Sequence, residues 1–297
     1  MNGAKGYRSV WTYLNTVPHK LAWVDVDGVR TRYLEAGPTD APVVVCIHGT
    51  AGSLENFAAN YAALASKYRV LGIDMVGCGY TDKPDYPYLA KDYAKHVAGF
   101  MDAMGIESAA LAGVSLGSWV SGRVALDFPD RVDAMVMFAP AGVTGDEQAE
   151  KEFFAGVRQR RMAAAAEPNW DTVTTAMRGL VLNKEDLVDD IIAVRLNIYR
   201  QPELQAAMPN LLAYIDDPNI SDEEWRSIDV PALVVASVDA PNMFLANSYR
   251  LAELMPRATL WEIRNCDHWP QFESPDEVNA EMIRFLDDAL LRVPAES

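Results

Sequence analysis

The order of apolar and polar residues predicts strands and helices in alternation over the first half of the chain. A short, wholly apolar run at residues 43–47 is typical of a strand that is covered on both faces. Alternation of this kind indicates a parallel sheet whose strands are joined by right-handed crossovers. Further strands are predicted at residues 69–73, 108–112 and 132–138, with helices at 56–67, 92–104 and 116–128.

Near the start of the chain, two segments that could form strands are separated by two residues that favour a turn. Residues 21–26 and 29–35 flank the pair Asp27-Gly28. Asp-Gly is favoured in two-residue turns between antiparallel strands. We therefore expect a β-hairpin before the parallel part of the sheet.

The pattern changes between residues 145 and 227, where only helical periodicity is found. Strands return at residues 232–236 and 258–263. We therefore predict an α/β core formed by residues 1–144 and 228–297, with helices on both faces of a mostly parallel sheet. Residues 145–227 would form an inserted helical cap over the carboxyl ends of the strands, where open α/β sheets bind ligands. Helices of the insertion are predicted at residues 147–166, 169–181, 185–199, 203–215 and 222–227, and later ones at 244–254 and 276–291.

Composition narrows the classes of function. The chain has 297 residues and a formal net charge of −16, which disfavours non-specific binding to nucleic acid or to an anionic membrane. Its three cysteines are widely spaced and form no metal-binding pair, so we expect a reducing compartment and no disulfide. No apolar run has the length of a membrane helix, and no signal-type segment is present. We expect a cytoplasmic protein without a metal or another cofactor.

The sequence G-V-S-L-G at residues 113–117 is the first candidate for chemistry. G-x-S-x-G is frequent by chance, but here a predicted strand precedes it and a predicted helix follows. That context is typical of a nucleophile elbow, in which a sharp turn exposes the serine oxygen. The amide of Leu116, at the helix N-terminus, would then point toward a reacting carbonyl. The alternative is a glycine-rich turn in which Ser115 only caps the helix.

A second candidate segment, H-G-T-A-G at residues 48–52, follows the strand at 43–47. A backbone amide there, that of Thr50, would supply the second donor to an oxyanion. Losing one such donor typically costs about 3 kcal/mol of transition-state stabilisation. We assign the imidazole of His48 a structural role in bracing the loop.

The base and the acid are predicted from their places after strands. Among four histidines, only His268 lies on a loop after the last strand, late enough to be the final member of a triad. Asp239 follows the strand at 232–236, where its carboxylate would orient the imidazole. The alternatives are that His268 is a loop histidine with structural partners and that Asp239 only forms a turn or caps a helix. Asp229 and Asp267 are poorer choices for the acid.

Two further features are interpreted as structural. The turn D-M-V-G-C-G-Y-T-D at residues 74–82 carries two glycines and follows a strand. Cys78 within it has no base nearby in the sequence, so a bystander thiol is favoured over a nucleophile.

Taken together, these motifs resemble the α/β-hydrolase superfamily over nearly the whole chain. The motifs are H-G-T-A-G at 48–52, D-M-V-G-C-G-Y-T-D at 74–82, G-V-S-L-G at 113–117 and D-H-W-P-Q-F-E-S-P-D-E-V-N at 267–279. The resemblance implies a Ser115–Asp239–His268 triad beneath a helical cap. Haloalkane dehalogenases and epoxide hydrolases of this fold carry Asp at the position of Ser115, so both are disfavoured.

Within the superfamily, two segments are similar to the meta-cleavage-product hydrolases, which cut a carbon–carbon bond in vinylogous diketo acids from aromatic hydrocarbon catabolism. H-W-P-Q-F-E at 268–273 follows the last strand, and V-R-L-N-I-Y-R-Q-P-E at 194–203 lies in the insertion. The resemblance implies that Arg195 grips the substrate carboxylate and that Trp269 lines the pocket. A solvated Arg195, or one paired with Asp190 or Glu203, is the alternative.

The resulting hypothesis is a serine hydrolase of 2-hydroxy-6-oxo-dienoates, which are small carboxylate-bearing substrates. His268 would transfer protons, and Ser115 would either attack the substrate or position water. Val114 stands where the carbon–carbon hydrolases usually have Asn, so a carboxylesterase or lactonase with the same triad is an alternative. A catalytically silent binding protein and a cofactor-free dioxygenase are further alternatives, and a homodimer is left open.

Overall fold

The computed structural model of the chain describes residues 8–144 and 146–291. Its strands are β1 His19–Val26, β2 Val29–Ala36, β3 Val43–Ile47, β4 Arg69–Ile73, β5 Ala109–Val114, β6 Val132–Phe138, β7 Ala232–Ser237 and β8 Ala258–Ile263. They form one sheet in the order β1-β2-β4-β3-β5-β6-β7-β8. β2 pairs antiparallel with β1 and β4, and all pairs from β4 to β8 are parallel. The predicted α/β class with a mostly parallel sheet is confirmed.

The turn between β1 and β2 has the conformation that its sequence predicts. Asp27 and Gly28 both have positive φ angles, 52° and 84°. Both central residues of a type I′ turn need this left-handed conformation, which Asp tolerates and Gly adopts freely. The carboxylate of Asp25 also accepts a hydrogen bond from the Gly28 amide at 3.0 Å. The expected hairpin is therefore present, at the outer edge of the sheet.

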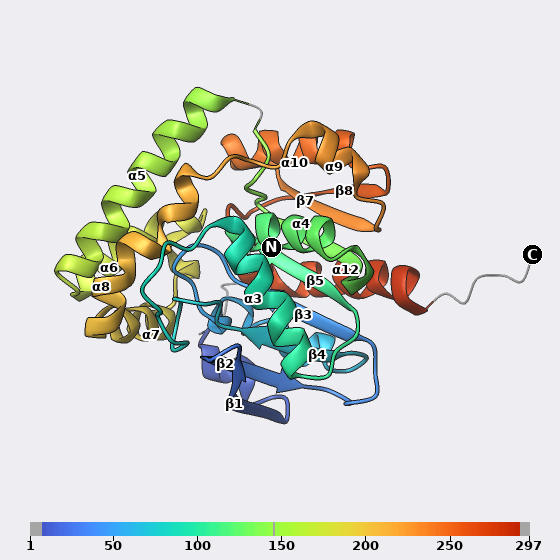
Figure 1. Cartoon of the computed structure of the whole chain (residues 1–297), viewed down its shortest axis with the longest axis horizontal. Coiled ribbons are helices and arrows are strands. Elements are labelled where there is room, and N and C mark those ends of the chain that lie inside the picture. Colours follow the sequence, from blue (N-terminus) through green and yellow to red (C-terminus); the bar gives the residue numbers. More distant parts are fainter. Residues whose placement is uncertain (1–7, 145, 292–297) are drawn as a thin grey trace, which may run out of the picture.

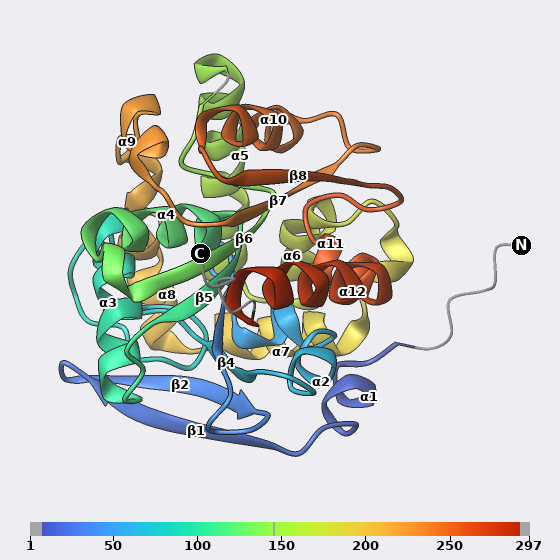
Figure 2. The same cartoon turned by 90° about the vertical axis from the view of Figure 1, so that its right-hand side faces the viewer.

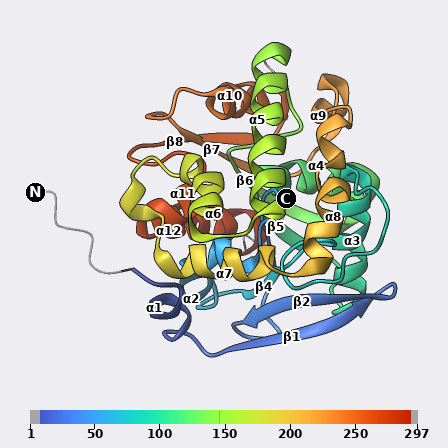
Figure 3. The same ribbon diagram turned by 90° about the vertical axis from the view of Figure 1, so that its left-hand side faces the viewer.

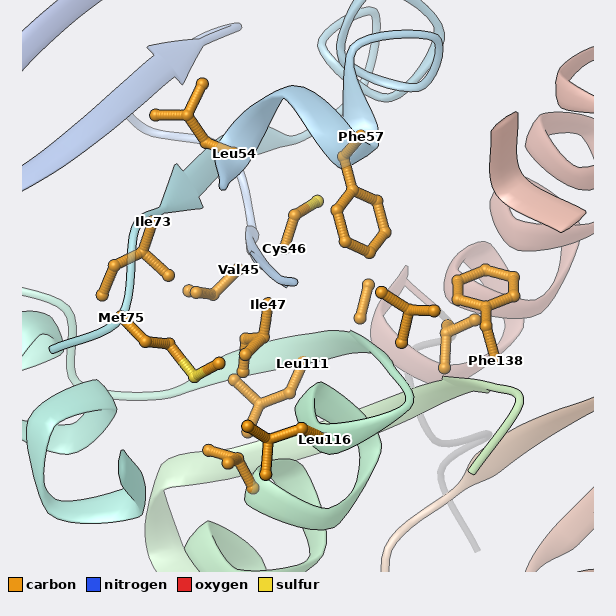
Figure 4. Close-up of a cluster of buried hydrophobic side chains, with 14 of the residues drawn as sticks. Val45, Cys46, Ile47, Leu54, Phe57, Ile73, Met75, Leu111, Leu116 and Phe138 are labelled. Atoms are coloured by element: carbon orange, nitrogen blue, oxygen red, sulfur yellow. The ribbon is translucent and has the colours of Figure 1, made fainter. Parts of the chain in front are cut away.

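The central strands are apolar because helices cover both faces of the sheet. Figure 2 shows α3 Ala90–Ala103 and α4 Leu116–Asp127 on one face, and α2 Tyr61–Leu64 and α12 Pro275–Leu286 on the other. Residues of β3, β4, β5 and β6 are almost entirely buried in consequence. Figure 4 shows part of this core, including Val45, Ile47, Leu111, Leu116 and Phe138.

The segment between β6 and β7 contains helices joined by short loops and no strand among its described residues, as the periodicity predicts. Figure 1 shows α5 to α8 gathered at one end of the sheet, and Figure 3 looks onto them. We call residues 147–227 the cap. The predicted division of the chain into a core domain and a cap domain stays a prediction. The elements are α5 Glu147–Ala166, α6 Trp170–Met177, η3 Arg178–Leu180, η4 Lys184–Asp186, α7 Asp189–Tyr199, α8 Pro202–Leu211, η5 Ala213–Asp216 and α9 Asp222–Ser227.

The helix predicted at residues 56–67 is wrong in extent. A short 3₁₀ helix, η1 Leu54–Phe57, and the single-turn α2 occupy this region instead. The buried side chain of Asn60 lies between them and donates to the Gln271 carbonyl at 3.0 Å and to Asn279 Oδ1 at 2.8 Å. These tertiary contacts anchor the chain where a continuous helix would run.

The remaining helices are short or close to their predicted positions. Four were not predicted as separate elements, because three to five residues show no periodicity. Among the described residues, no helix has the length and apolar character needed to cross a membrane. The elements are α1 Val10–Leu14, η2 Pro129–Arg131, α10 Met243–Leu254, α11 Pro270–Glu273 and η6 Asp287–Leu291.

Candidate active site

Ser115 occupies a sharp turn between β5 and α4. Its φ and ψ angles are 57° and −116°, a conformation that a residue with a side chain seldom adopts. Its amide nonetheless donates to the Phe138 carbonyl at 2.8 Å, so the strained residue is held in line with the neighbouring strand. Strain of this kind persists only where the surroundings enforce it, as at a nucleophile elbow.

The two glycines of the motif permit this turn because there is no room for a side chain at either position. A Cβ added at Gly113 would lie 2.3 Å from the carbonyl carbon of Gly117. A Cβ at Gly117 would lie 2.2 Å from the carbonyl oxygen of Ile47. The β5–α4 turn thus packs directly against the end of β3. The geometry favours the elbow interpretation over a flexible glycine-rich loop.

Five of the seven predicted site residues line one small cavity beneath the cap. Ser115, His268, Trp269, Thr50 and Arg195 come from three turns or loops of the core and one helix of the cap. The cavity has a volume of about 30 Å³, which is about the space of one water molecule. Any organic substrate therefore has to displace cap side chains to enter. The other lining residues are Gly49, Gly52, Asn56, Phe153, Phe154, Val157, Arg161 and Leu180.

His268 lies after β8 and is buried against the ring of Phe244, with ring centroids 4.3 Å apart. Burial, together with the positive charge of Arg161, lowers the pKa of His268 to about 3. The imidazole is consequently neutral at pH 7, the form that accepts a proton. No described hydrogen bond joins it to Ser115, although both line the cavity. Such contacts are often long before a substrate binds.

The loop after β3 carries the predicted second oxyanion donor. Thr50 lines the cavity, and its hydroxyl is hydrogen-bonded to the phenol of Tyr214 from η5 of the cap. Ala51, the next residue, has a positive φ of 49°, so the loop turns sharply at this point. The Leu116 amide begins α4 directly after the serine, and the first amides of a helix lack intrahelical acceptors. The assignment of these two amides as oxyanion donors stays a prediction.

His48 and His96 have structural partners, which confirms the bracing role expected for His48. Its Nε2 accepts from the Met75 amide at 3.1 Å and its Nδ1 lies 2.7 Å from the Gly49 carbonyl. His96 Nδ1 accepts from the Val76 amide at 3.2 Å. Burial lowers the pKa of both imidazoles, to about 4 for His48 and about 3 for His96.

Asp239 is not brought to His268. It lies exposed on the loop after β7, where one carboxylate oxygen accepts from Arg264 at 3.1 Å and the other from the Asn265 amide at 2.9 Å. Asp267 also points elsewhere, since its carboxylate accepts from Asn242 at 2.9 Å. No described carboxylate is hydrogen-bonded to His268. The assignment of Asp239 as the acid therefore stays a prediction.

Arg195 lies on α7 and is only 2% exposed, so the solvated alternative does not hold. One guanidinium nitrogen donates to the Ala51 carbonyl, and another lies 3.4 Å from Asn56 Oδ1. Its Nε has no hydrogen-bond partner in the described structure. Neither Asp190 nor Glu203 pairs with it among the described contacts. A buried, charged donor without a carboxylate thus faces the cavity.

Sequence reasoning missed two polar residues of the cavity, Asn56 and Arg161. Arg161 lies on α5 and is 5% exposed. Its charge acts on both His268 and Arg195. The signal that could have found it is the spacing of Phe154, Val157 and Arg161, which places all three on one face of α5. Asn56 fell inside the helix that was predicted too long.

The features interpreted as structural are confirmed. Asp74 is fully buried and accepts hydrogen bonds from the Leu54 and Tyr80 amides at 2.7 and 2.9 Å. The thiol of Cys78 is buried, and burial raises its pKa to about 12. A thiol of that pKa is not ionised at neutral pH and is a poor nucleophile. Among the described residues, no group of three or more His, Cys, Asp or Glu side chains could hold a metal ion.

The chain belongs to the alpha/beta hydrolase fold family, whose model matches residues 42–275. This match spans β3 to the start of α12 and includes the serine elbow, the cap and the histidine loop. Among curated relatives, a 2-hydroxy-6-oxo-6-(2'-aminophenyl)hexa-2,4-dienoic acid hydrolase of Metapseudomonas resinovorans is 27% identical over 275 residues. The alignment covers 89% of this chain and 90% of that protein.

Two further similar proteins, one known from its structure and one from its sequence, differ from each other in activity. The solved structure of a meta-cleavage product hydrolase from Pseudomonas fluorescens IP01 has a TM-score of 0.78 and 27% identity, covering 93% of this chain and 99% of that one. Carboxylesterase YbfK of Bacillus subtilis is 25% identical over 261 residues, covering 86% of this chain and 84% of that protein. The chain is thus similar in sequence and structure to carbon–carbon bond hydrolases, and in sequence also to an ester hydrolase.

Proposed function

We propose that the protein is a serine hydrolase that cleaves a carbon–carbon bond in 2-hydroxy-6-oxo-dienoates. The observation that carries the proposal is one buried cavity lined by a strained serine, a neutral histidine and an unpaired arginine: Ser115, His268 and Arg195. A serine and a base alone suit any acyl transfer. The unpaired guanidinium adds a site for a substrate carboxylate, because Arg binds carboxylates in a planar, two-pronged geometry.

Each of these groups has a distinct task in the proposed reaction. The Leu116 and Thr50 amides hold the oxyanion that forms when the 6-keto carbon is attacked, either by Ser115 or by water that it positions. His268 accepts the proton of the attacking hydroxyl and returns a proton to the carbon that leaves, so the proton count balances. The bond between C5 and the 6-keto carbon breaks. On the route through Ser115, water then hydrolyses the acyl-serine, and His268 takes a proton from this water and returns it to the serine oxygen. On either route the 6-keto carbon ends as a carboxylic acid. Trp269 forms a wall of the pocket beside His268.

Arg195 has a second contact that the test has to take into account. Because its guanidinium also donates to the Ala51 carbonyl, it braces the oxyanion loop as well as facing the cavity. Loss of the carboxylate contact would affect only substrates that carry the carboxylate. Loss of the brace would slow every substrate. An ester without a carboxylate therefore separates the two roles.

The decisive experiment compares loss of the visible absorbance of a ring-fission dienoate with hydrolysis of a neutral aryl ester. We expect Arg195→Ala to lower kcat/KM for the dienoate by about 10- to 100-fold, the range for a charged hydrogen bond, and to change the ester value much less. Equal losses would assign Arg195 to the loop alone. Ser115→Ala should abolish labelling by a fluorophosphonate probe; undiminished dienoate turnover in this variant would remove the nucleophile or water-positioning role.

A carboxylesterase is the second candidate. The similarity to a carboxylesterase over most of the chain favours it, and so does Val114, which is fully buried and presents no polar group beside the serine. In that case the wild-type protein would turn over the aryl ester and leave the dienoate unchanged. Cytoplasmic location and a homodimer stay predictions; gel filtration tests the second.

A further inference from the structure

Two buried arginines face the cavity, and neither is paired with a carboxylate in the described structure. The single described hydrogen bond of the Arg161 side chain is a long one, 3.3 Å from Nη1 to the Tyr199 phenol. Arg195 contacts a backbone carbonyl and an amide oxygen and leaves Nε without an acceptor. Both residues are at most 5% exposed. Fully buried arginines are rare in proteins unless an opposite charge accompanies them.

The same chain shows how it treats a buried arginine whose role is structural. Arg32 is 6% exposed, similar to Arg161, but it forms ion pairs with both Glu55 and Asp74. Acidic residues are abundant, 42 against 26 basic ones. Yet none of the described residues that line the cavity is acidic. The charge of Arg161 and Arg195 is therefore left for a ligand rather than neutralised by the protein.

We propose that the cavity binds a dicarboxylate, with Arg195 holding the carboxylate of the dienoate and Arg161 holding a second carboxylate at the other end of the substrate. This inference rests on the proposed function for the identity of the first carboxylate. The two guanidiniums come from different cap helices, α7 and α5, and both residues line the same cavity. A ligand with one negative charge would leave one of the two buried cations unneutralised.

The electrostatics of the site agree with a substrate of two negative charges. Burial is the main cause that lowers the pKa of Arg195, and the charge of Arg161 is the next. The two cations thus repel one another in a place with little water. A carboxylate beside each guanidinium neutralises both charges and removes this repulsion, which favours the dicarboxylate over a monocarboxylate of equal length.

The first test uses turnover of two substrates that differ in one carboxylate. 2-Hydroxy-6-oxonona-2,4-dienoate carries one, and 2-hydroxy-6-oxonona-2,4-dienedioate, which has the same chain length, carries two. Arg161→Gln should lower kcat/KM for the dicarboxylate by about 10- to 100-fold, because it removes one charged hydrogen bond, and change the monocarboxylate value by less than about threefold. Arg160→Gln is the matched control: it removes the same charge from an exposed neighbour on α5 and should alter neither value.

The second test does not depend on turnover. Adipate and hexanoate have six carbons each and differ by one carboxylate, and calorimetry measures the Kd of each. Wild type should bind adipate at least about tenfold tighter than hexanoate, and Arg161→Gln should abolish this preference. Arg161→Lys retains the charge and should keep part of it. Melting temperatures check that both variants are folded.

The outcomes separate the two proposals. Equal losses for both dienoates in Arg161→Gln, or no loss for either, would overturn the dicarboxylate proposal. So would equal affinities of adipate and hexanoate for the wild-type protein. If neither dienoate is hydrolysed but adipate binds through Arg161, the proposed reaction fails while the dicarboxylate site stands.

Discussion

Replacing Asp239 by Asn tests whether its carboxylate serves His268 or only the protein surface. The substitution keeps the shape of the side chain and removes its charge. In the structure, both carboxylate oxygens already have partners, Arg264 and the Asn265 amide. No described hydrogen bond reaches the histidine. These contacts predict an enzyme that works almost normally without this carboxylate, whereas the triad predicted from the sequence requires it.

The two roles predict effects of very different size. An ion pair at an exposed position contributes about 0.2–1 kcal/mol to folding, so Asp239→Asn should lower the free energy of unfolding by no more than about 1 kcal/mol. A carboxylate that serves only the surface has no part in the reaction. In that case kcat should stay within about threefold of wild type, which corresponds to about 0.6 kcal/mol in the activation free energy. Removing the acid of an assembled triad instead lowers kcat by about 10⁴-fold. The two outcomes cannot be confused.

The assay is steady-state hydrolysis of the dienoate, or of the aryl ester, with unfolding in urea measured in parallel. Arg264→Ala is the companion variant, because it frees Asp239 without changing the carboxylate. We expect it to leave kcat unchanged. A loss of 10³-fold or more in Asp239→Asn, or a rise in kcat in Arg264→Ala, would show that Asp239 leaves its surface partners and orients His268 during the reaction.

Three further predictions concern the elbow, a buried histidine and the cap. A Cβ at Gly113 would lie 2.3 Å from backbone of Gly117, so Gly113→Ala should lower both Tm and fluorophosphonate labelling, whereas Gly179→Ala, with nothing within 4 Å, should change neither. The pKa of His96 is about 3 in the folded chain and about 6.5 when unfolded, so its contribution to stability is lost as pH falls through this window. Urea unfolding at several pH values gives the free energy of unfolding as a function of pH. Between these two pKa values, this free energy should rise with pH less steeply in His96→Gln than in wild type, by about 1.4 kcal/mol per pH unit. Equal dependence on pH in the two proteins would contradict the neutral, buried state. Phe154 lines both the catalytic cavity and a larger, open one of about 930 Å³. Phe154→Ala should destabilise the fold by about 3–5 kcal/mol and raise kcat/KM for bulky aryl esters relative to small ones; an unchanged ratio would show that this ring does not limit access.

The strands could be predicted from the sequence because each is a short apolar run bounded by polar or turn-forming residues. β3, β4, β6 and β8 begin and end where the pattern places them. Ser115 and His268 could be predicted for a related reason. Parallel strands deliver their carboxyl ends to one edge of a sheet, so residues just after β5 and β8 meet in space.

The rest of the site depends on side-chain directions that the sequence does not specify. Asp239 is placed after the right strand, but which way its carboxylate points depends on competing donors, and Arg264 and Asn265 take both oxygens. Arg161 sits in a run with Arg158 and Arg160, and composition alone cannot tell which of the three is buried. Helical spacing from Phe154 excludes Arg160 but not Arg158, which lies four residues on and shares the face. The burial of Arg161 is therefore evident only from the packing of the cap over the serine.

The charge of the whole chain and the charge of the cavity act at different distances. The net charge of −16 repels an anionic substrate in the surrounding solvent, but salt screens such forces beyond about 8 Å at physiological ionic strength. Inside the cavity, Arg161 and Arg195 act through little water and without acidic neighbours, so their attraction is only weakly screened. Recognition of an anion by these two side chains therefore takes place inside the cavity. On this reasoning, substitutions at the two arginines change how long a dicarboxylate stays bound more than how fast it arrives.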